Sequence, residues 1–431
     1  MRFTAAGDII IQRRIHGDFE GYAELAPFVS QGDIRFFNLE TTLNREGECF
    51  ASQFSGGTYL RTVPEVLDDI KKFGFNMTSF NNNHALDFSY GGLFKTLDAL
   101  DKSGLLHTGV GRDLNEASAP CCIDSANGRV ALISVSTSFE PSMMAGNAGA
   151  RYRGRPGVNG IRLTEKLSVG RDEYEFIKKL ASKLKINAEN EISRREGYLP
   201  LLSGNIAEFG ELRFELGERC ERRLVLNETD MQRIEKSLYE ASFLADYVVL
   251  SVHSHELDGE RKEDVPEFLS ELAHRCIDMG ADAIIGHGPH LLRPIEIYND
   301  KPIFYSLGDF ILELYSVESA PADFFEQWGL DMNGTVRDLL RVRSRDFTVG
   351  LMEDRRMTES VIPFWKTKDK KLTSLTLMPN ELVTKGNKSE IGLPRKAKNY
   401  GMIDRLSEMS AKYGIKMTIR GDGTVSCDWQ R

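Results

Sequence analysis

Short apolar segments with a polar residue at or near their C-terminal ends constrain the fold of this chain more than any other feature. These segments are RFTAAGDIII (2–11), IRFFNLE (34–40), MTSF (77–80), DYVVLSVH (246–253) and ADAIIG (281–286). Their length and apolar character are typical of buried strands. Amphipathic segments such as VPEVLDDIKKFG (63–74), which ends at Gly74, separate them and indicate helices. Strands that alternate with helices at this spacing predict a layered α/β sheet.

A good metal ligand stands at or just after the end of each of these segments. The ligands are Asp8, Glu40, Asn83, His84, His253, His287 and His290. We expect them to meet at one edge of the sheet. Carboxylates, an amide oxygen and imidazoles, with no thiolate, suit divalent Mn, Fe, Zn or Mg. Two such ions roughly 3.5–4 Å apart bind an anionic ester and generate a hydroxide nucleophile. The pattern therefore predicts two divalent metal ions and ester hydrolysis.

Each of these residues also has an ordinary structural explanation. Asp8 in a Gly-Asp pair is a common turn residue, and His84 in NNNHALD (81–87) is also compatible with a helix cap. In VHSHE, His253 and His255 share one face of a strand, which suits either a metal site or a surface pair. GHGPH (286–290) is the stronger signal, because its glycines let the backbone turn both imidazoles toward one point.

Several segments together resemble a known family. GDIII (7–11), FNLETTL (37–43), FNNNHALDFSYGGLFKTLDAL (80–100) and VVLSVHSHE (248–256) are similar, in this order, to the motifs of the CapA-type poly-γ-glutamate capsule synthesis family, a branch of the calcineurin-like metallophosphoesterases. The resemblance covers most of 3–135 and 245–312. It implies an α/β fold, a four-layer α-β-β-α sandwich with an inserted helical and loop segment, and a metal-dependent phosphoesterase-type hydrolase.

The resemblance also assigns roles to residues. It implies the metal ligands Asp8, Glu40, Asn83, His253, His287 and His290. Asp8 and His290 would hold the first ion, and Glu40 stands where the superfamily uses a bridging aspartate. Asn83, His253 and His287 would hold the second ion. His84 would be the general acid or would stabilise the leaving oxygen, and Asp87 would orient it.

The chain departs from the family pattern at a few positions. Ile10 stands where the wider superfamily usually has a histidine, Gly288 stands in GHGPH where the family commonly reads GHHPH, and Asp309 stands in SLGDF where it reads SLGNF. His255 directly follows the VHS segment and either adds a ligand, binds substrate or faces water.

A basic cluster is the other candidate for substrate binding. Arg151, Arg153 and Arg155 lie in a loop rich in glycine and proline, and Arg155 is the best placed of them to bind a phosphate or carboxylate by paired hydrogen bonds. A solvated loop of mixed charge is the alternative.

The domain organisation follows from where the alternation of strands and helices is interrupted. We expect a single metallophosphoesterase-like domain over 1–431, with an insertion at 140–225 that contains one charged helix (173–196) and acts as a lid or cap. The segment 302–310 reads as one strand. Strands at 347–353, 360–366 and 372–379 and a helix at 402–414 lie in the C-terminal part, 340–431, which we expect to complete the second sheet.

Composition limits the partners. The net charge of −9 argues against nucleic-acid binding, which needs a basic surface. The six cysteines show no CxxC pair, which indicates reduced thiols. The sequence shows no signal peptide and no membrane-spanning segment, which predicts a cytoplasmic protein. The expected substrate is a small or polymeric anion.

Besides the hydrolase, the sequence leaves two alternatives. The first is a protein that binds or assembles an anionic polymer such as poly-γ-glutamate without cutting a bond, recruited by a membrane-associated synthase. The second is a degenerate family member with one metal ion or none. Elemental analysis separates these alternatives, since about two ions per chain favours the enzyme.

Overall fold

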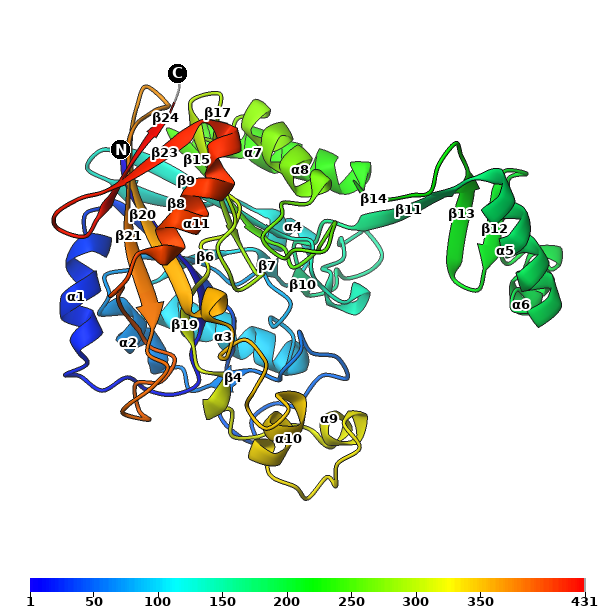
Figure 1. Cartoon of the computed structure of the whole chain (residues 1–431), viewed down its shortest axis with the longest axis horizontal. Helices are drawn as coiled ribbons and strands as arrows, with labels where there is room; N and C mark the ends of the chain where they lie inside the picture. The colour runs from blue at the N-terminus through cyan, green and yellow to red at the C-terminus, as the bar shows by residue number, and fades with distance from the viewer. Residues whose placement is uncertain (430–431) are drawn as a thin grey trace. The chain divides into compact units, whose positions relative to one another are not determined.

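Two β-sheets form the centre of the fold in the computed structural model, which describes residues 1–429. The larger sheet has the order β23-β24-β21-β20-β1-β2-β5-β6, with β19 beside β1 and β22 beside β21. Its strands β20 and β21 are labelled in Figure 1. Its strands are β1 (Arg2–Ile10), β2 (Ile34–Leu39), β5 (Met77–Ser79), β6 (Leu106–Thr108), β19 (Asp309–Leu312), β20 (Glu359–Lys368), β21 (Lys371–Leu382), β22 (Pro394–Lys396), β23 (Ile415–Ile419) and β24 (Val425–Trp429).

The smaller sheet has the order β17-β18-β16-β15-β9-β8. Its strands are β8 (Cys121–Ser125), β9 (Gly128–Ser136), β15 (Tyr247–His253), β16 (Ala283–His287), β17 (Ile295–Tyr298) and β18 (Lys301–Phe304). Two short pairs lie outside both sheets, β3 (Thr42–Leu43) with β4 (Arg61–Thr62) and β7 (Val110–Gly111) with β10 (Gly157–Val158).

An apolar core fills the space between the two sheets. Phe3 and Trp365 of the larger sheet stack with ring centroids 5.0 Å apart, and they belong to one buried cluster with Leu132 and Val249 of the smaller sheet. Each contributing strand turns alternate side chains toward this layer, so the burial of apolar area joins the sheets.

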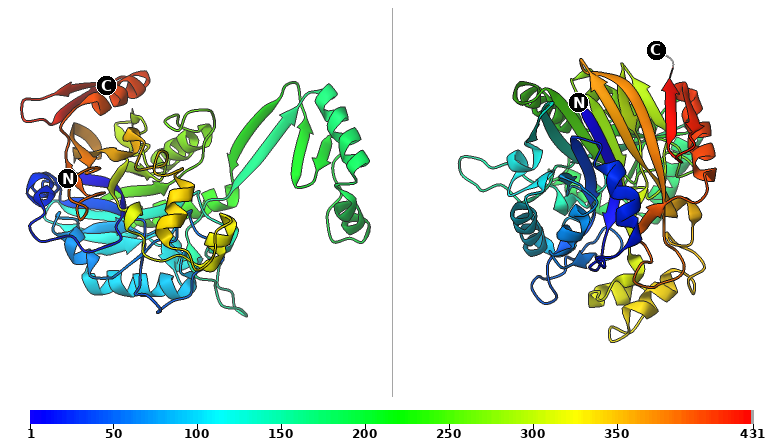
Figure 2. Two further views of the ribbon diagram at one scale, coloured as in Figure 1. Left: turned by 60° about the horizontal axis from the view of Figure 1, so that its bottom comes forward. Right: turned by 90° about the vertical axis from the view of Figure 1, so that its left-hand side faces the viewer.

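Helices cover the outer face of each sheet (Figures 1 and 2). α1 (Glu20–Val29), α2 (Val66–Lys71) and α3 (Ser89–Ser103) pack on the larger sheet. α7 (Glu228–Leu244) and α8 (Glu267–Asp278) bury their apolar faces beside the smaller sheet. The four-layer α-β-β-α sandwich expected from the resemblance is therefore confirmed. Outside residues 162–228, the other helical segments of the described chain are α4 (Leu114–Ser118), α9 (Ala322–Gln327), α10 (Val336–Arg343), α11 (Gly401–Ser410) and the 3-10 turns Pro141–Met143, Leu314–Ser316, Arg355–Thr358 and Ala411–Tyr413.

Residues Arg162–Glu228 form a compact unit with a core of its own, and Met1–Ile161 with Thr229–Arg431 form the other. The smaller unit contains a sheet in the order β12-β13-β11-β14, built from β11 (Leu163–Val169), β12 (Ile206–Phe209), β13 (Leu212–Leu216) and β14 (Glu221–Leu226). The single helix expected over 173–196 is wrong. The chain forms α5 (Arg171–Leu184) and α6 (Ala188–Arg195), because Lys185 adopts a left-handed conformation with φ 53° that ends the first helix.

The strand expected over 302–310 is also wrong as one element. β18 belongs to the smaller sheet, whereas β19 lies parallel to β1 in the larger sheet. Gly308, with φ +75°, carries the chain from one sheet to the other, and its carbonyl oxygen would lie 1.8 Å from a Cβ on Gly7. The two glycines allow the close approach that places Asp309 opposite Asp8.

The C-terminal part joins the sheet that contains β1. The strands expected at 360–366 and 372–379 are confirmed as β20 and β21, and the helix expected at 402–414 is confirmed as α11 with the turn that follows it. The strand expected at 347–353 is wrong, since that segment forms turns near Gly350, whose φ is +126°.

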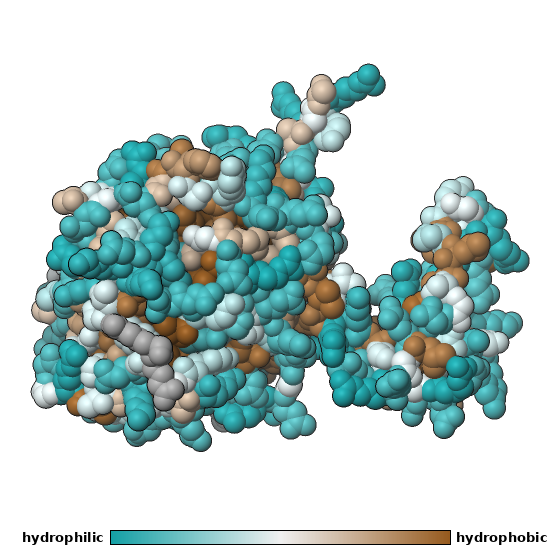
Figure 3. All heavy atoms as spheres, turned by 90° about the horizontal axis from the view of Figure 1, so that it is seen from above, coloured by the Kyte–Doolittle hydropathy of each residue, from teal (hydrophilic) through white to brown (hydrophobic). Residues whose placement is uncertain are grey.

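Among residues 1–429, no helix combines the length and apolar character needed to cross a membrane. Hydrophilic side chains dominate the surface seen in Figure 3.

Candidate metal centre

The predicted ligands converge from both sheets rather than from one. Asp8 lies near the end of β1, and Glu40 and Asn83 follow β2 and β5, which run parallel to it. His253 and His287 end β15 and β16 of the smaller sheet and stand opposite each other in the parallel pairing. The carboxyl ends of parallel strands in the two sheets thus face a common point.

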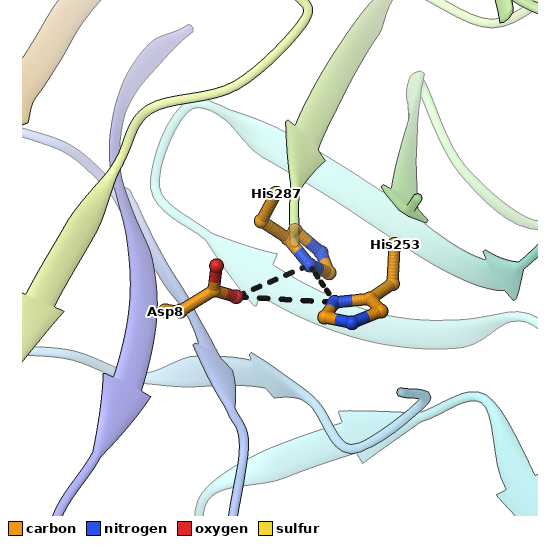
Figure 4. Close-up of side chains that lie close together, drawn as sticks. All are labelled: Asp8, His253 and His287. Carbon is orange, nitrogen blue, oxygen red and sulfur yellow. Dashed lines mark hydrogen bonds and ion pairs between the residues drawn. The ribbon is translucent and has the colours of Figure 1, made fainter. Parts of the chain in front are cut away.

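Asp8 and the two strand-end histidines form the first group of side chains (Figure 4). The Nδ1 atoms of His253 and His287 are 2.9 Å apart, and Asp8 Oδ1 lies 3.4 Å from His287 Nδ1 and 3.9 Å from His253 Nδ1. The Asn38 amide donates to Asp8 Oδ1 (2.7 Å) and the Gly288 N–H donates to Asp8 Oδ2 (2.9 Å). These two hydrogen bonds orient the Asp8 carboxylate toward the imidazoles.

Glu40 forms the second group with His253 and His255. Its Oε1 lies 3.6 Å from His253 Nε2, 3.8 Å from His255 Nε2 and 3.9 Å from His84 Nε2. Both Glu40 carboxylate oxygens are fully buried and accept no hydrogen bond from any described residue. Burial, with Asp8 and Asp309 nearby, raises the pKa of Glu40 well above its usual range. A buried carboxylate without a donor is costly, and a bound cation would supply the missing partner.

Asp309 forms a third group with Asp8 and His290. Asp309 Oδ1 lies 2.9 Å from His290 Nδ1, and its Oδ2 is buried without a hydrogen bond from the described residues. The sequence did not predict this carboxylate, because a single strand over 302–310 would have kept it in the smaller sheet. Its presence in SLGDF, where an asparagine was expected, was the available signal.

Burial and neighbouring charges shift the pKa values of the cluster. Burial and the Asp309 charge raise the pKa of Asp8 to about 6. Burial lowers the pKa of His287 to about 3 and that of His253 well below its usual value. Burial also acts to lower the pKa of His290, but the nearby charge of Asp309 outweighs this effect and raises that pKa. Neutral imidazoles are the form that binds metal, and a cation would favour ionised carboxylates, so the donor set fits divalent ions.

His84 and Asp87 form a pair beside the cluster. His84 Nδ1 lies 2.7 Å from Asp87 Oδ2, and Asp87 also accepts from the N–H groups of Leu60 (2.8 Å) and Gly56 (3.2 Å). Burial raises the pKa of Asp87, although His84 partly offsets that effect. Since Asp87 fixes Nδ1, the His84 ring turns Nε2 toward Glu40.

The remaining predicted residues lie at different depths. Asn83 Oδ1 is 2.7 Å from His253 Nε2, and its amide nitrogen donates to the Gly56 carbonyl, so the oxygen faces the cluster. His255 is partly exposed, and its Nε2 lies 3.0 Å from His253 Nε2. Arg155 is exposed, and its Nε donates to the Met144 carbonyl (3.0 Å). The structure thus brings His255 to the cluster and places Arg155 on the surface.

Two supporting residues were missed. Ser251 Oγ lies 2.7 Å from His287 Nε2, and Asn38 binds Asp8 as described. Ser251 precedes His253 by two positions, so strand periodicity places both on one face and was sufficient to find it. Asn38 likewise precedes Glu40 by two positions, but Glu40 lies beyond the end of β2, where strand periodicity no longer applies.

The fold and this cluster define a layered α/β protein with a buried carboxylate–imidazole centre, suited to divalent metal ions, at the ends of its strands. Residues 2–313 match the model of the family described as bacterial capsule synthesis protein PGA_cap, and the chain belongs to this family.

Curated relatives extend over most of the chain. An uncharacterized protein, y4sH, of Sinorhizobium fredii is 31% identical over 96% of this chain and 90% of its own length. The PGA biosynthesis protein CapA of Bacillus subtilis is 25% identical over 73% of this chain and 65% of its own length. The capsule biosynthesis protein CapA of Bacillus anthracis is 23% identical over 73% and 60%.

Proposed function

We propose that the protein is a metal-dependent hydrolase of the phosphoesterase type. The observation that carries this proposal is Glu40, whose two buried oxygens accept no hydrogen bond from the described residues and whose Oε1 faces imidazoles from the opposite sheet. Two bound divalent ions would bind an anionic ester and supply a hydroxide nucleophile near neutral pH. Asp8, His290 and Asp309 would hold one ion and Asn83, His253 and His287 the other, with Glu40 shared between them.

His84 would deliver the proton that the leaving oxygen needs. Asp87 accepts from Nδ1 and stabilises the imidazolium, so the proton on Nε2 is the one available for transfer. His84 lines a cavity of about 810 Å³ together with His255 and His290, which gives a substrate access to this nitrogen. The Asp87 carboxylate is held by two backbone N–H groups and therefore keeps the ring in one orientation.

The proposal predicts both metal content and turnover. Purified protein should contain about two ions per chain by elemental analysis and should hydrolyse an aryl phosphate mono- or diester with Mn²⁺. A chelator should abolish the reaction, and added metal should restore it. Metal-loaded protein that cleaves none of a broad panel of phosphate esters would contradict the proposal.

The relatives' names favour a second candidate. Two of them are named for PGA or capsule biosynthesis, so the same centre would hold the carboxylates of an anionic polymer without cutting a bond. This role predicts the same two metal ions as the hydrolase, so metal content does not separate the two roles. It differs in predicting binding of poly-γ-glutamate that a chelator abolishes, no esterase activity, and co-purification with a membrane-associated synthase. Esterase activity that depends on His84 would exclude a purely binding role.

Metal binding should stabilise the fold more at about pH 7.5 than at about pH 5. Since the pKa of Asp8 is raised to about 6, a metal ion must displace its proton at the lower pH. In the metal-free protein a raised carboxyl pKa favours the folded state at low pH, and that contribution is lost as the pH rises through about 6. The measurement is the difference in Tm with and without Mn²⁺ at each pH. An equal difference at both would contradict the assignment of Asp8.

A further inference from the structure

The cavity that contains His84, His255 and His290 extends beyond the metal centre. Its volume is about 810 Å³, and its far side is built from the loop around Gly56–Leu60 and from the segment around Leu340–Met357. Two cationic side chains in its lining, Lys262 and Arg343, have no role in the mechanism above.

Lys262 lies in the loop between β15 and α8 and is half-buried. No carboxylate of residues 1–429 forms an ion pair with it. Burial lowers the pKa of Lys262, while the more distant charges of Asp309 and Asp354 act against that shift. Lys262 lines the same cavity as His255 and His290.

Arg343 is the last residue of α10 and is also half-buried. Its guanidinium lies over the rings of Phe324 (5.1 Å) and Trp328 (5.7 Å), and its Nη1 donates to Thr58 Oγ1 (2.6 Å). Across the described chain it has no carboxylate partner. The aromatic contacts hold the guanidinium in place and leave further N–H groups free to bind an anion.

Thr58 connects Arg343 to the metal centre. It belongs to the same loop as Gly56, whose carbonyl accepts from Asn83. A Cβ on Gly56 would lie 2.8 Å from His84 Nε2, so this loop packs directly on the proposed proton donor. Arg343 therefore lies next to the loop that packs on His84, and Lys262 lines the same cavity.

The other charged groups of the lining are largely engaged. Arg355 pairs with Glu359 (2.7 Å), and Asp354 pairs with Arg356 (2.6 Å). The exposed Glu353 accepts from the Tyr315 hydroxyl (2.9 Å). Among residues 1–429, these two half-buried cations thus form no ion pair with a carboxylate, in a chain of net charge −9. Burial of an unpaired charge is unfavourable, and an anionic ligand would relieve it through charge-assisted hydrogen bonds.

We propose that Lys262 and Arg343 bind anionic groups of the substrate that lie beyond the ester held at the metal centre. The natural substrate would then carry at least one further phosphate or carboxylate. This inference rests on the proposed function, which places the reacting ester at the metal ions.

Three phosphonates that cannot be hydrolysed test the proposal on the full-length, Mn²⁺-loaded protein. Phenylphosphonate carries one anionic group, 4-carboxyphenylphosphonate adds a carboxylate, and 1,4-phenylenebisphosphonate adds a second phosphonate. Isothermal titration calorimetry should show that at least one of the two-group probes binds about tenfold more tightly than phenylphosphonate. The two-group probe that binds more tightly than phenylphosphonate shows whether the second anionic group of the substrate is a carboxylate or a phosphate.

Variants locate the origin of that gain. The gain should disappear in Lys262→Met and fall in Arg343→Met, and Lys262→Arg, which keeps the charge, should restore most of it. Lys236→Met on α7, an exposed lysine paired with Glu240, is the matched control and should bind like the unaltered protein. Thermal unfolding checks that each variant is folded. No gain in the unaltered protein, or a gain that survives in both methionine variants, would overturn the proposal.

The binding assay needs no turnover, so the two proposals can fail separately. Hydrolysis of simple esters without any affinity gain would refute the anion site and leave the hydrolase intact. An affinity gain that depends on Lys262, in a protein without esterase activity, would refute the hydrolase and assign the same cations to the binding of an anionic polymer.

Discussion

Replacing Glu40 by glutamine should stabilise the metal-free protein and at the same time remove most of its response to metal ions. Glu40 is buried, near the charges of Asp8 and Asp309, and no residue of 1–429 donates a hydrogen bond to it, so its ionised form opposes folding when no cation is bound. A neutral amide of the same shape removes that repulsion, and we expect a gain of about 1–3 kcal/mol at neutral pH. The same change removes the ligand that the two ions would share, and metal content should fall below two per chain.

Glu313→Gln is the matched control for this experiment. Glu313 is equally buried, but it pairs with Arg13 (2.7 Å) and accepts from the Gln12 N–H (2.8 Å). Its replacement should destabilise the protein with and without metal and leave metal content unchanged. Chemical denaturation in chelator and in Mn²⁺ measures both quantities. A Glu40→Gln variant that is less stable in chelator, and still responds fully to Mn²⁺, would show that no cation binds at this carboxylate.

His84→Ala should lower kcat by about 10²–10⁴-fold while metal content stays at two ions per chain. The imidazole touches Asp87 and faces Glu40. Other contacts hold the ligands in place: Asn38 and Gly288 donate to Asp8, the Asn83 amide donates to the Gly56 carbonyl, and Ser251 Oγ lies 2.7 Å from His287 Nε2. The defect should be larger for an alkyl phosphate than for a p-nitrophenyl ester, because the poorer leaving group depends more on proton donation.

Asp87→Asn is the companion variant, since it keeps the shape but loses the charge that stabilises the imidazolium. We expect a smaller loss of kcat than in His84→Ala and a weaker dependence on the leaving group. Elemental analysis measures the metal content of both variants, and steady-state kinetics measures their kcat on both esters. If His84→Ala loses metal ions together with activity, or affects both esters equally, the residue does not act as the proton donor.

Much of the layered fold could be predicted because periodicity and strand-end chemistry are local signals. The strands that carry Asp8, His253 and His287 stand out as apolar runs, and the ends of parallel strands must share an edge. That argument did not reveal that the edges of two sheets face each other, because an apolar strand carries no mark of the sheet to which it belongs.

Other features depend on contacts between distant segments. The path of 302–310 is determined by Gly308 and its approach to Gly7, which no local pattern contains. Asp309 was therefore overlooked as a neighbour of Asp8. Lys262 and Arg343 lie in a loop and at a helix end, where hydrophobic periodicity says nothing about direction. In the inserted unit, the amphipathic pattern continues through Lys185 and hides the break between α5 and α6.

The position of β1 has a consequence for biosynthesis. This first strand pairs with β2 but also with β19 and β20, so it is enclosed by parts of the chain made much later (Figure 2). The Asp8 carboxylate accepts a hydrogen bond from the backbone N–H of Gly288, 280 positions downstream, and it forms a candidate metal-binding group with Asp309, which lies further along the chain. A growing polypeptide therefore cannot bring the candidate ligands together until residues up to Asp309 have left the ribosome, and metal binding at this site would come late in synthesis.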